Sequence, residues 1–493
     1  MSLKFGWAEV DITPKKGTKI GLAGQFFERI TDEVESPITV TALTIESESD
    51  YVITCACDLV CVGDNLNKLV KEKLLADGNV NPEKVIISAI HTHTSYVYTR
   101  QSLLSPSTFD YLKSVIPEDM AYKPLVSNED RVDPDVALEF LANKIVEAVI
   151  SSWNNRKSGY YRNGFGRAAV GMCRRVCYDD GSALMWGDTN TANFTELESG
   201  NDNGIELIFT YDQNKKITGV IGNIACPAQV VEHRSYISSD YWGKVKENLR
   251  KEYGEDIFVL GLCSAAGDQC PRDMVRWVEP ESYIDDPNIK REVVLKRNAD
   301  PSMFDVSGLK LVGRRISNEI IAVHEELNSE YIDKAEFVYR TLKLELPLRR
   351  VTKEDYQIAK EKIDQFIERN RGKTINFDDN AKMHVYSGIM ARYELQKTVT
   401  VFPIEVHILR LGEIAIATNP FELFLNYGNQ IRARSKAKQT FLIQLACGSG
   451  GYLPTEKAEK GGHYSAYVSS GYVGHEGGNL LVAKTLDEIN KMF

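Results

Sequence analysis

Short apolar runs of β-type residues alternate with longer amphipathic stretches along most of the chain, and this alternation limits the folds that the sequence can adopt. Strands are expected at residues 40–46, 51–60, 84–90, 205–211, 217–225, 257–263, 406–411 and 414–418. Helices, with apolar side chains at helical spacing, are expected at 65–75 and 136–153. The pattern predicts an α/β fold of mixed type: one large single domain with extensive mixed β-sheets flanked by helices. The helix-rich stretch 331–380 leaves a second domain as an alternative.

Charge and composition exclude several classes of partner. The chain has 493 residues and a formal net charge of −10, and it contains no long basic run. This argues against nucleic acid and anionic membrane surfaces as main partners. No stretch approaches the ~20 apolar residues of a membrane-spanning helix.

The beginning of the chain and its cysteines bear on the compartment. The first residues lack a charged segment followed by an apolar one, so no secretory signal is visible. The nine cysteines are scattered and show no paired CxxC spacing. A cytoplasmic protein with reduced thiols is therefore expected.

The first candidate site is His91-Thr92-His93, at the end of the strand expected at 84–90. In extended backbone, residues i and i+2 point to the same side of the strand. Two imidazoles that leave a buried strand together suit one metal ligand and one general acid/base. The alternative is a hydrogen-bonded pair of structural histidines, and the motif alone does not decide between them.

A second motif, Gly267-Asp268-Gln269-Cys270-Pro271, follows the strand expected at 257–263. Its small residues allow close approach of substrate, and its turn would present N–H donors. The alternative is a tight structural turn in which Asp268 bonds backbone amides. Ser264 and Cys270 are candidate nucleophiles, although no base is adjacent to either in the sequence.

Three further segments combine breaks in regular structure with reactive side chains. Pro420 predicts a helix start with Glu422 in its first turn, as a metal ligand or as a complement to the helix dipole. The glycine-rich stretches around Tyr452 and Tyr464 predict unusual backbone. Cys226 is either a soft metal ligand or a buried structural thiol.

Two irregular segments, 98–135 and 273–304, each follow a candidate motif. They are expected to be insertions, acting either as lids over a site or as surface excursions.

Taken in order, the motifs resemble those of the neutral/alkaline (non-lysosomal) ceramidase family, from about Gly6 to about Gly478. The motifs that carry the resemblance are Asp11-Ile12-Thr13-Pro14, His91-Thr92-His93, Gly267-Asp268-x-x-Pro271, Pro420-x-Glu422 and Gly451-Tyr452-Leu453-Pro454-Thr455. Members of that family are zinc amidases that cleave the N-acyl bond of ceramide into sphingosine and fatty acid. The resemblance implies a metal-dependent hydrolase that acts on a ceramide-like lipid or another small N-acylated compound.

The resemblance also implies a role for individual residues. Zinc is expected at His91, Glu422 and Tyr452. The catalytic residues are expected to be His93 as acid/base, Arg174 and Tyr464 around the scissile amide, and Asp268. Substrate contacts are expected from Gly24, Ser264 and Cys270.

The chain departs from the family pattern at three points. Cys226-Pro227 stands where the family has a zinc-ligating histidine, so a fourth ligand would have to be Cys226 or His233. Cys270 stands where the family has serine. Residues 1–493 correspond to the family's catalytic domain, and its C-terminal immunoglobulin-like domain is expected to be absent.

Three other functions remain open from the sequence. The same scaffold would serve a hydrolase of ester or glycosidic bonds. Cys270 would be the nucleophile of a cysteine enzyme. A protein that has lost its metal would only bind its ligand. No oligomeric state follows from the sequence.

Overall fold

The structure is a computed structural model that describes residues 3–25, 28–98, 130–276, 306–371 and 377–493, together with positions 115 and 117. The two expected insertions, 98–135 and 273–304, lie largely outside these ranges, so their expected role as lids stays a prediction.

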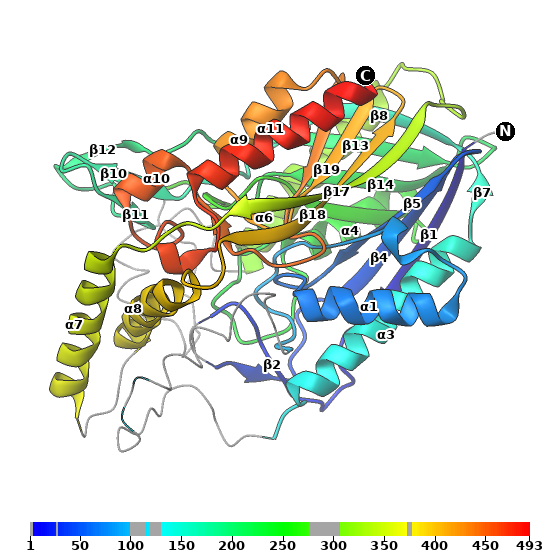
Figure 1. Cartoon of the computed structure of the whole chain (residues 1–493). Helices are drawn as coiled ribbons and strands as arrows, with labels where there is room; N and C mark the ends of the chain where they lie inside the picture. The colour runs from blue at the N-terminus through cyan, green and yellow to red at the C-terminus, as the bar shows by residue number, and fades with distance from the viewer. Residues whose placement is uncertain are drawn as a thin grey trace.

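Three mixed sheets form the body of the molecule, and all three follow the same plan (Figure 1). In each sheet, antiparallel strands are followed by one parallel pair, and the connection within that pair contains a helix. A parallel pair requires such a crossover, and the helix covers the outer face of its own sheet. The plan recurs three times although the sequence shows no internal repeat.

The first sheet lies near the N-terminus and has helices on its outer face. Its elements are β1 (Lys4–Asp11), β4 (Thr39–Glu46), β5 (Tyr51–Cys57), β6 (Val85–Ala89), β7 (Lys157–Ser158), α1 (Asp64–Asp77) and α3 (Pro134–Asn154). The strand order is β6-β5-β4-β1-β7, and α1 joins the parallel strands β5 and β6. Helices α1 and α3 pack on the sheet through one apolar cluster that includes Leu66, Val70, Leu141 and Ile145.

The second sheet is built from the middle of the chain. Its elements are β8 (Tyr160–Arg167), β13 (Gly204–Tyr211), β14 (Ile217–Ile224), β15 (Phe258–Cys263), α4 (Tyr241–Tyr253) and α6 (Val306–Glu326). The order is β15-β14-β13-β8, and α4 joins the parallel strands β14 and β15. Both helices bury apolar side chains against this sheet, among them Val245, Leu249, Val312 and Ile316.

The third sheet contains the C-terminal part of the chain. Its elements are β17 (Phe337–Pro347), β18 (Val401–Leu411), β19 (Ile414–Thr418), β21 (Gln439–Ile443), α9 (Leu425–Arg434) and α11 (His475–Met492). The order is β17-β18-β19-β21, and α9 joins the parallel strands β19 and β21. Helices α9 and α11 share an apolar cluster with this sheet.

The inner faces of the three sheets share one apolar cluster at the centre of the molecule. Trp7, Leu260 and Phe441 represent the three sheets in this cluster, and all are buried. A hydrogen bond also joins the second and third sheets: the Asn223 side-chain amide of β14 donates to Leu442 O of β21 at 2.8 Å. The carboxyl ends of β6, β14, β15, β19 and β21 therefore meet in one region, where ligand sites of α/β proteins commonly form.

Shorter elements surround this body. They are β2 (Ile20–Gly21), β3 (Ile30–Thr31), β9 (Met172–Cys173), β10 (Arg175–Tyr178), β11 (Ala183–Met185), β12 (Phe194–Leu197), β16 (Gln269–Cys270), β20 (Glu422–Leu423), β22 (Tyr452–Leu453), α10 (Glu456–Gly461), η1 (Pro82–Lys84) and η2 (Val468–Ser470). A helical hairpin of α7 (Lys353–Asn370) and α8 (Phe377–Leu395) projects from the body and has a small apolar core of its own (Figure 1).

The structure confirms the expected mixed α/β class and a single domain. The stretch 331–380 is not a separate domain, because β17 belongs to the third sheet and pairs with β18 along its whole length. Within the described ranges, no helix is long and apolar enough to cross a membrane.

The helix start expected at Pro420 is wrong. Residues Glu422 and Leu423 are extended and pair in parallel with Tyr452 and Leu453, and α9 begins only at Leu425. The backbone N–H of Glu422 donates to Gly451 O at 2.9 Å, and this pairing keeps the segment extended.

A buried ion cluster ties α4 to the first sheet. Glu9 of β1 accepts from Lys246 at 3.1 Å and from Arg250 at 2.6 Å, and both cations belong to α4. Asp58, which follows β5, lies 3.8 Å from Lys246. Burial by itself would raise the pKa of Glu9, but the two cations outweigh it and lower the pKa from 4.5 to about 2.

We expect Glu9→Gln to lower the free energy of unfolding by about 2 kcal/mol at pH 7, because the charged hydrogen bonds of a largely buried carboxylate are lost. Since the folded-state pKa is depressed, this contribution is complete above pH 4.5 and is lost as the pH falls toward about 2. Urea titrations between pH 7 and pH 3 measure the difference. The exposed Glu255→Gln serves as control, and a difference that does not shrink below pH 4.5 would contradict the account.

Candidate active site

His91 stands just beyond the end of β6, where its side chain is held by the main chain. Its Nδ1 lies 2.7 Å from Val60 O. A carbonyl oxygen only accepts, so Nδ1 carries a proton, which leaves Nε2 as the nitrogen that the neutral ring offers to a metal. That Nε2 lies 3.5 Å from the Glu422 carboxylate and 3.2 Å from His93 Nε2.

The expected pairing of His91 and His93 is present, but its expected backbone geometry is wrong. His91 has φ +72°, so the segment is not an extended strand at this point. The two rings meet edge to face, at 81° and with centroids 4.8 Å apart. The left-handed residue turns the chain so that the imidazoles face each other rather than lie in parallel.

His93 is enclosed by main chain and by a carboxylate. Gly24 has φ +95°, and a Cβ at this position would lie 2.5 Å from His93 Nδ1, so only glycine fits against the ring. Arg29 donates to His93 O at 2.7 Å and to Ala23 O at 2.6 Å, which fixes both segments. The Glu232 carboxylate lies 3.5 Å from His93 Nδ1.

His93 and Glu232 differ in charge. Burial and the neighbouring His91 lower the pKa of His93 well below its usual value, so its imidazole is neutral. Burial opposes ionisation of Glu232, but the neighbouring His233 and Arg174 lower its pKa. We assign the carboxylate as ionised because Arg174 is a permanent cation.

Arg174, Tyr452 and Tyr464 form a second group of side chains. The Arg174 guanidinium donates to Tyr452 OH at 3.4 Å, to Gln229 Oε1 at 3.2 Å and to Gly267 O at 3.1 Å. The hydroxyls of Tyr452 and Tyr464 are 3.5 Å apart. Burial raises the pKa of Tyr464 to about 12 and that of Tyr452 well above its usual value, so both are neutral hydrogen-bond donors.

Glu422 connects the two groups. It lies within 3.5 Å of His91, and it pairs through the backbone with Tyr452 in the parallel bridge of β20 and β22. Gly267 allows this approach, because a Cβ there would lie 2.3 Å from Glu422 O. The structure therefore brings together all of the residues expected at the metal and the scissile bond except Asp268 and the fourth ligand.

Asp268 supports the site and does not face it. One carboxylate oxygen accepts from the N–H of Leu425 at 2.8 Å, at the start of α9, and the other accepts from Ser199 at 2.6 Å. Its backbone carbonyl accepts from Arg174 N at 3.0 Å. The side chain thus orients the segment that follows Glu422, and the backbone carbonyl holds Arg174 between β9 and β10.

Ser264 and Cys270 are buried and engaged elsewhere. Ser264 Oγ accepts from Arg432 at 2.5 Å, and Arg432 also pairs with Asp202 at 2.9 Å. The Cys270 thiol lies 3.3 Å from Arg272 O, and burial raises its pKa to about 12. A thiol with such a pKa is protonated at neutral pH and is not an activated nucleophile.

Neither candidate for a fourth metal ligand contacts His91 in the described part of the chain. The Cys226 thiol is fully buried, next to Pro227 O at 3.7 Å, and burial raises its pKa well above its usual value. His233 is partly exposed and pairs with Glu232 at 3.2 Å. The sequence change at the family's histidine position is therefore not compensated by either residue.

Two of the expected zinc ligands, His91 and Glu422, are spaced to hold a metal ion. The separation of 3.5 Å between His91 Nε2 and Glu422 Oε2 is close to the ~3.3 Å between two ligands of a tetrahedral zinc with bonds of about 2.0–2.1 Å. The hydrogen bond from Nδ1 to a carbonyl is the usual support of a metal-bound histidine. Among the described residues, no three His, Cys, Asp or Glu side chains are grouped to hold a metal.

The loop that carries Tyr464 is held by a buried ion pair. Arg175 and Glu198 form two charged hydrogen bonds of 2.6 and 3.0 Å, and both side chains are buried. The same guanidinium donates to the carbonyls of Tyr464 and Gly462 at 3.1 and 2.9 Å. Three of the residues around Tyr464 have positive φ: Gly462, His463 and Ser465.

Sequence reasoning missed Glu232, Gln229, Arg29 and the Arg175–Glu198 pair as parts of the site. Glu232 follows the apolar residues Val230 and Val231, and a carboxylate in such a run was the one available signal. Arg29 and Arg175 act through backbone carbonyls of other segments, and Gln229 accepts from the side chain of Arg174. No local pattern reveals such contacts.

Comparison with known proteins identifies the fold. No protein-family profile matches the sequence, and no curated protein sequence matches it. The neutral ceramidase from Pseudomonas aeruginosa superposes with a TM-score of 0.66 at 15% identity, covering 100% of this chain and 74% of that chain. A ceramidase solved in complex with C2 gives a TM-score of 0.66 at 12% identity, covering 100% of this chain and 75% of that one.

At 12–15% identity, the likeness establishes a shared fold and does not by itself establish a shared activity. It confirms over the whole chain the fold that the five ordered motifs imply. The chain has the fold of the neutral ceramidases.

Proposed function

We propose that the chain is a hydrolase of an N-acyl amide bond in a ceramide-like lipid or another small N-acylated substrate. The observation that carries the proposal is the neutral imidazole of His93, whose pKa is lowered by burial and in part by Arg174, beside a hydrogen-bonded chain of Arg174, Tyr452 and Tyr464. His93 belongs to the end of β6, whereas Arg174, Tyr452 and Tyr464 come from two other parts of the chain. Ceramidases of the same fold support the choice of an amide bond.

The residues suit the steps of amide hydrolysis. Water attacks the carbonyl carbon, and His93 accepts the proton that the water loses. Arg174 and Tyr464 donate hydrogen bonds to the oxyanion that forms. The C–N bond then breaks, and His93 returns the proton to the leaving amine. Glu232 lies beside Nδ1 and stabilises the transient imidazolium.

We further propose a zinc ion held by His91, Glu422 and Tyr452. Catalytic zinc sites take three protein ligands and keep one position open, so neither Cys226 nor His233 is needed. When bound, zinc lowers the pKa of a coordinated water and polarises the carbonyl. The orientation of His91 by Val60 O and the separation of His91 from Glu422 support this proposal.

We propose a reducing compartment such as the cytoplasm. All nine cysteines are free, and eight of them are buried. Disulfides would be expected in many proteins of this size in an oxidising compartment.

Kinetic assays of the purified chain on matched chromogenic amide, ester and glycoside substrates test the proposed reaction. We expect turnover of the N-acyl amide and its loss in His93→Ala. The control is His475→Ala at the start of α11, where the imidazole pairs with Glu459. Turnover of the ester or glycoside alone, or ligand binding without any turnover, would overturn the proposal.

We expect Tyr464→Phe to lower kcat by about 100-fold with little change in KM, because removal of one oxyanion donor acts mainly on the transition state. The control is Tyr160→Phe in β8, which removes a hydroxyl from a partly exposed ring of the second sheet. Equal effects of the two substitutions on kcat would show that the Tyr464 hydroxyl does not stabilise the oxyanion.

We expect about one zinc per chain in protein purified without a polyhistidine tag, measured by elemental mass spectrometry, because three protein ligands make one catalytic site. His91→Ala should lose most of the metal, whereas His475→Ala should retain it. Full zinc occupancy in His91→Ala would rule out the proposed ligand set.

We expect Glu198→Gln to lower the free energy of unfolding by about 3 kcal/mol, because it leaves the buried Arg175 without its carboxylate. Glu196→Gln, which removes an exposed pair with Lys457, should cost less than about 0.5 kcal/mol. If the pair positions Tyr464, Glu198→Gln lowers kcat in the parent enzyme but not in the Tyr464→Phe background. An equal loss of kcat in both backgrounds would mean that the pair only stabilises the fold.

A further inference from the structure

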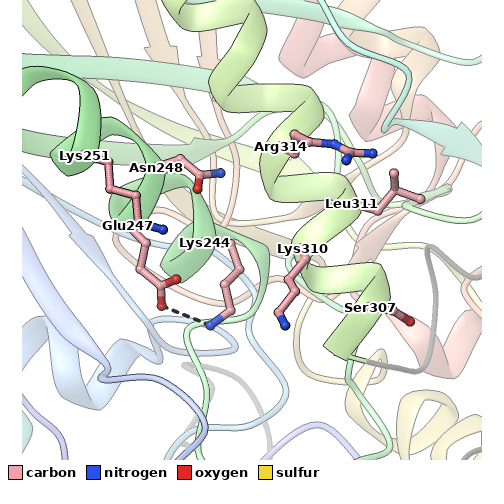
Figure 2. A pocket seen from close by; sticks show the side chains of 8 residues that line it. All are labelled: Lys244, Glu247, Asn248, Lys251, Ser307, Lys310, Leu311 and Arg314. Carbon is pink, nitrogen blue, oxygen red and sulfur yellow. Dashed lines mark hydrogen bonds and ion pairs between the residues drawn. The ribbon is translucent and has the colours of Figure 1, made fainter.

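A cationic cleft lies between α4 and α6 on the outer side of the second sheet (Figure 2). It has a volume of about 510 Å³, which falls within the range of small-molecule sites. Its lining residues are Lys244, Glu247, Asn248, Lys251, Ser307, Lys310, Leu311 and Arg314. None of them belongs to the active site described above.

The walls of the cleft are fixed by close helix packing. Gly313 of α6 faces α4, and a Cβ there would lie 2.5 Å from Lys244 Cβ. The Asn248 amide donates to Ser317 Oγ at 3.0 Å and joins the two helices directly. Since the buried sides of both helices also share one apolar cluster, the cleft exists before any ligand binds.

Cations outnumber carboxylates in the cleft. Lys244 is paired with Glu35 at 2.7 Å and with Glu247 at 3.0 Å. Lys251, Lys310 and Arg314 form no ion pair within the described part of the chain, although they line the same space. Four cations against two carboxylates leave a net charge of about +2 in a chain whose net charge is −10.

We propose that this cleft binds a phosphate group. Three unpaired cations match the charge of a dianion better than that of a single carboxylate. Arg314 offers the planar fork that fits phosphate oxygens, and the lysines supply further point charges in the lining of the cleft. Figure 2 shows Lys244 and Lys310 extending into the space between the two helices. The phosphate belongs either to a free phosphorylated metabolite or to the headgroup of an anionic lipid.

The site is independent of the proposed hydrolase activity, so binding and turnover can be measured separately. The cleft variant is Lys310→Gln/Arg314→Gln, which removes two exposed cations of α6. The matched control is Lys362→Gln/Arg369→Gln, which removes one lysine and one arginine from the exposed side of α7. Circular dichroism of both variants establishes that they are folded.

Two probes distinguish the sources of phosphate. Inorganic phosphate is titrated by calorimetry, and flotation is measured with phosphatidylcholine vesicles with and without phosphatidic acid. We expect the parent and control proteins to bind at least one probe, and the cleft variant to bind it roughly 10-fold more weakly. Binding of inorganic phosphate indicates a free ligand, whereas binding only to vesicles that contain phosphatidic acid indicates a lipid headgroup.

Absence of binding to both probes by the parent protein would overturn the proposal. So would equal affinities of the parent protein and the cleft variant, or an equal loss of affinity in the α7 control. Binding should also weaken as salt is raised from about 0.05 to about 0.5 M, because the Debye length falls from about 14 to about 4 Å and the charges are screened.

Discussion

The central apolar cluster shared by the three sheets is the constraint on which the rest of the structure depends. Each sheet has one face toward this cluster and a layer of helices on the other face. Strands buried on both sides are largely apolar, which favours the segments where strands end as the place for the side chains of the site. The three parallel pairs end in the same region, so these segments meet although they are far apart in the sequence.

The candidate site follows directly from this arrangement. His91 and His93 continue from β6, Gln229 and Glu232 follow β14, and Glu422 follows β19. Ion pairs and hydrogen bonds behind the site then fix the loops: Asp268 orients the start of α9, and Arg175 with Glu198 holds the loop of Tyr464. Substitution of these supporting residues should therefore affect catalysis although their side chains do not contact the substrate.

Much of the fold was predictable from the sequence, because apolar periodicity predicts the strands, and the order of motifs picks out side chains that the structure brings together. Local patterns failed where a distant segment decides the conformation. Pro420 is typical of a helix start, yet the backbone pairing of Glu422 with the segment of Tyr452 keeps that stretch extended. The role of Asp268 as a cap for Leu425 joins two segments more than 150 residues apart, so no local pattern predicts it. The sequence left open a tight turn in which Asp268 bonds backbone amides, but the amide that its carboxylate bonds belongs to the distant Leu425.

The same constraint keeps the other proposed site residues in place where the sequence lacks the histidine of the family pattern. Cys226 lies in a fully buried segment after β14, where its thiol serves packing. The residues proposed to move protons and stabilise charge all lie on other segments, so the loss of one ligand position leaves them in place. The departure from the family pattern therefore concerns the metal coordination more than the chemistry of the site.

The most direct test of the central claim is hydrolysis of a short-chain ceramide in water enriched in ¹⁸O, with both products measured by mass spectrometry. Attack of water on the amide carbonyl predicts equal amounts of free amine and fatty acid, with one ¹⁸O atom in the carboxylate of the acid. Unchanged ceramide, or release of acid without the label, would contradict the account.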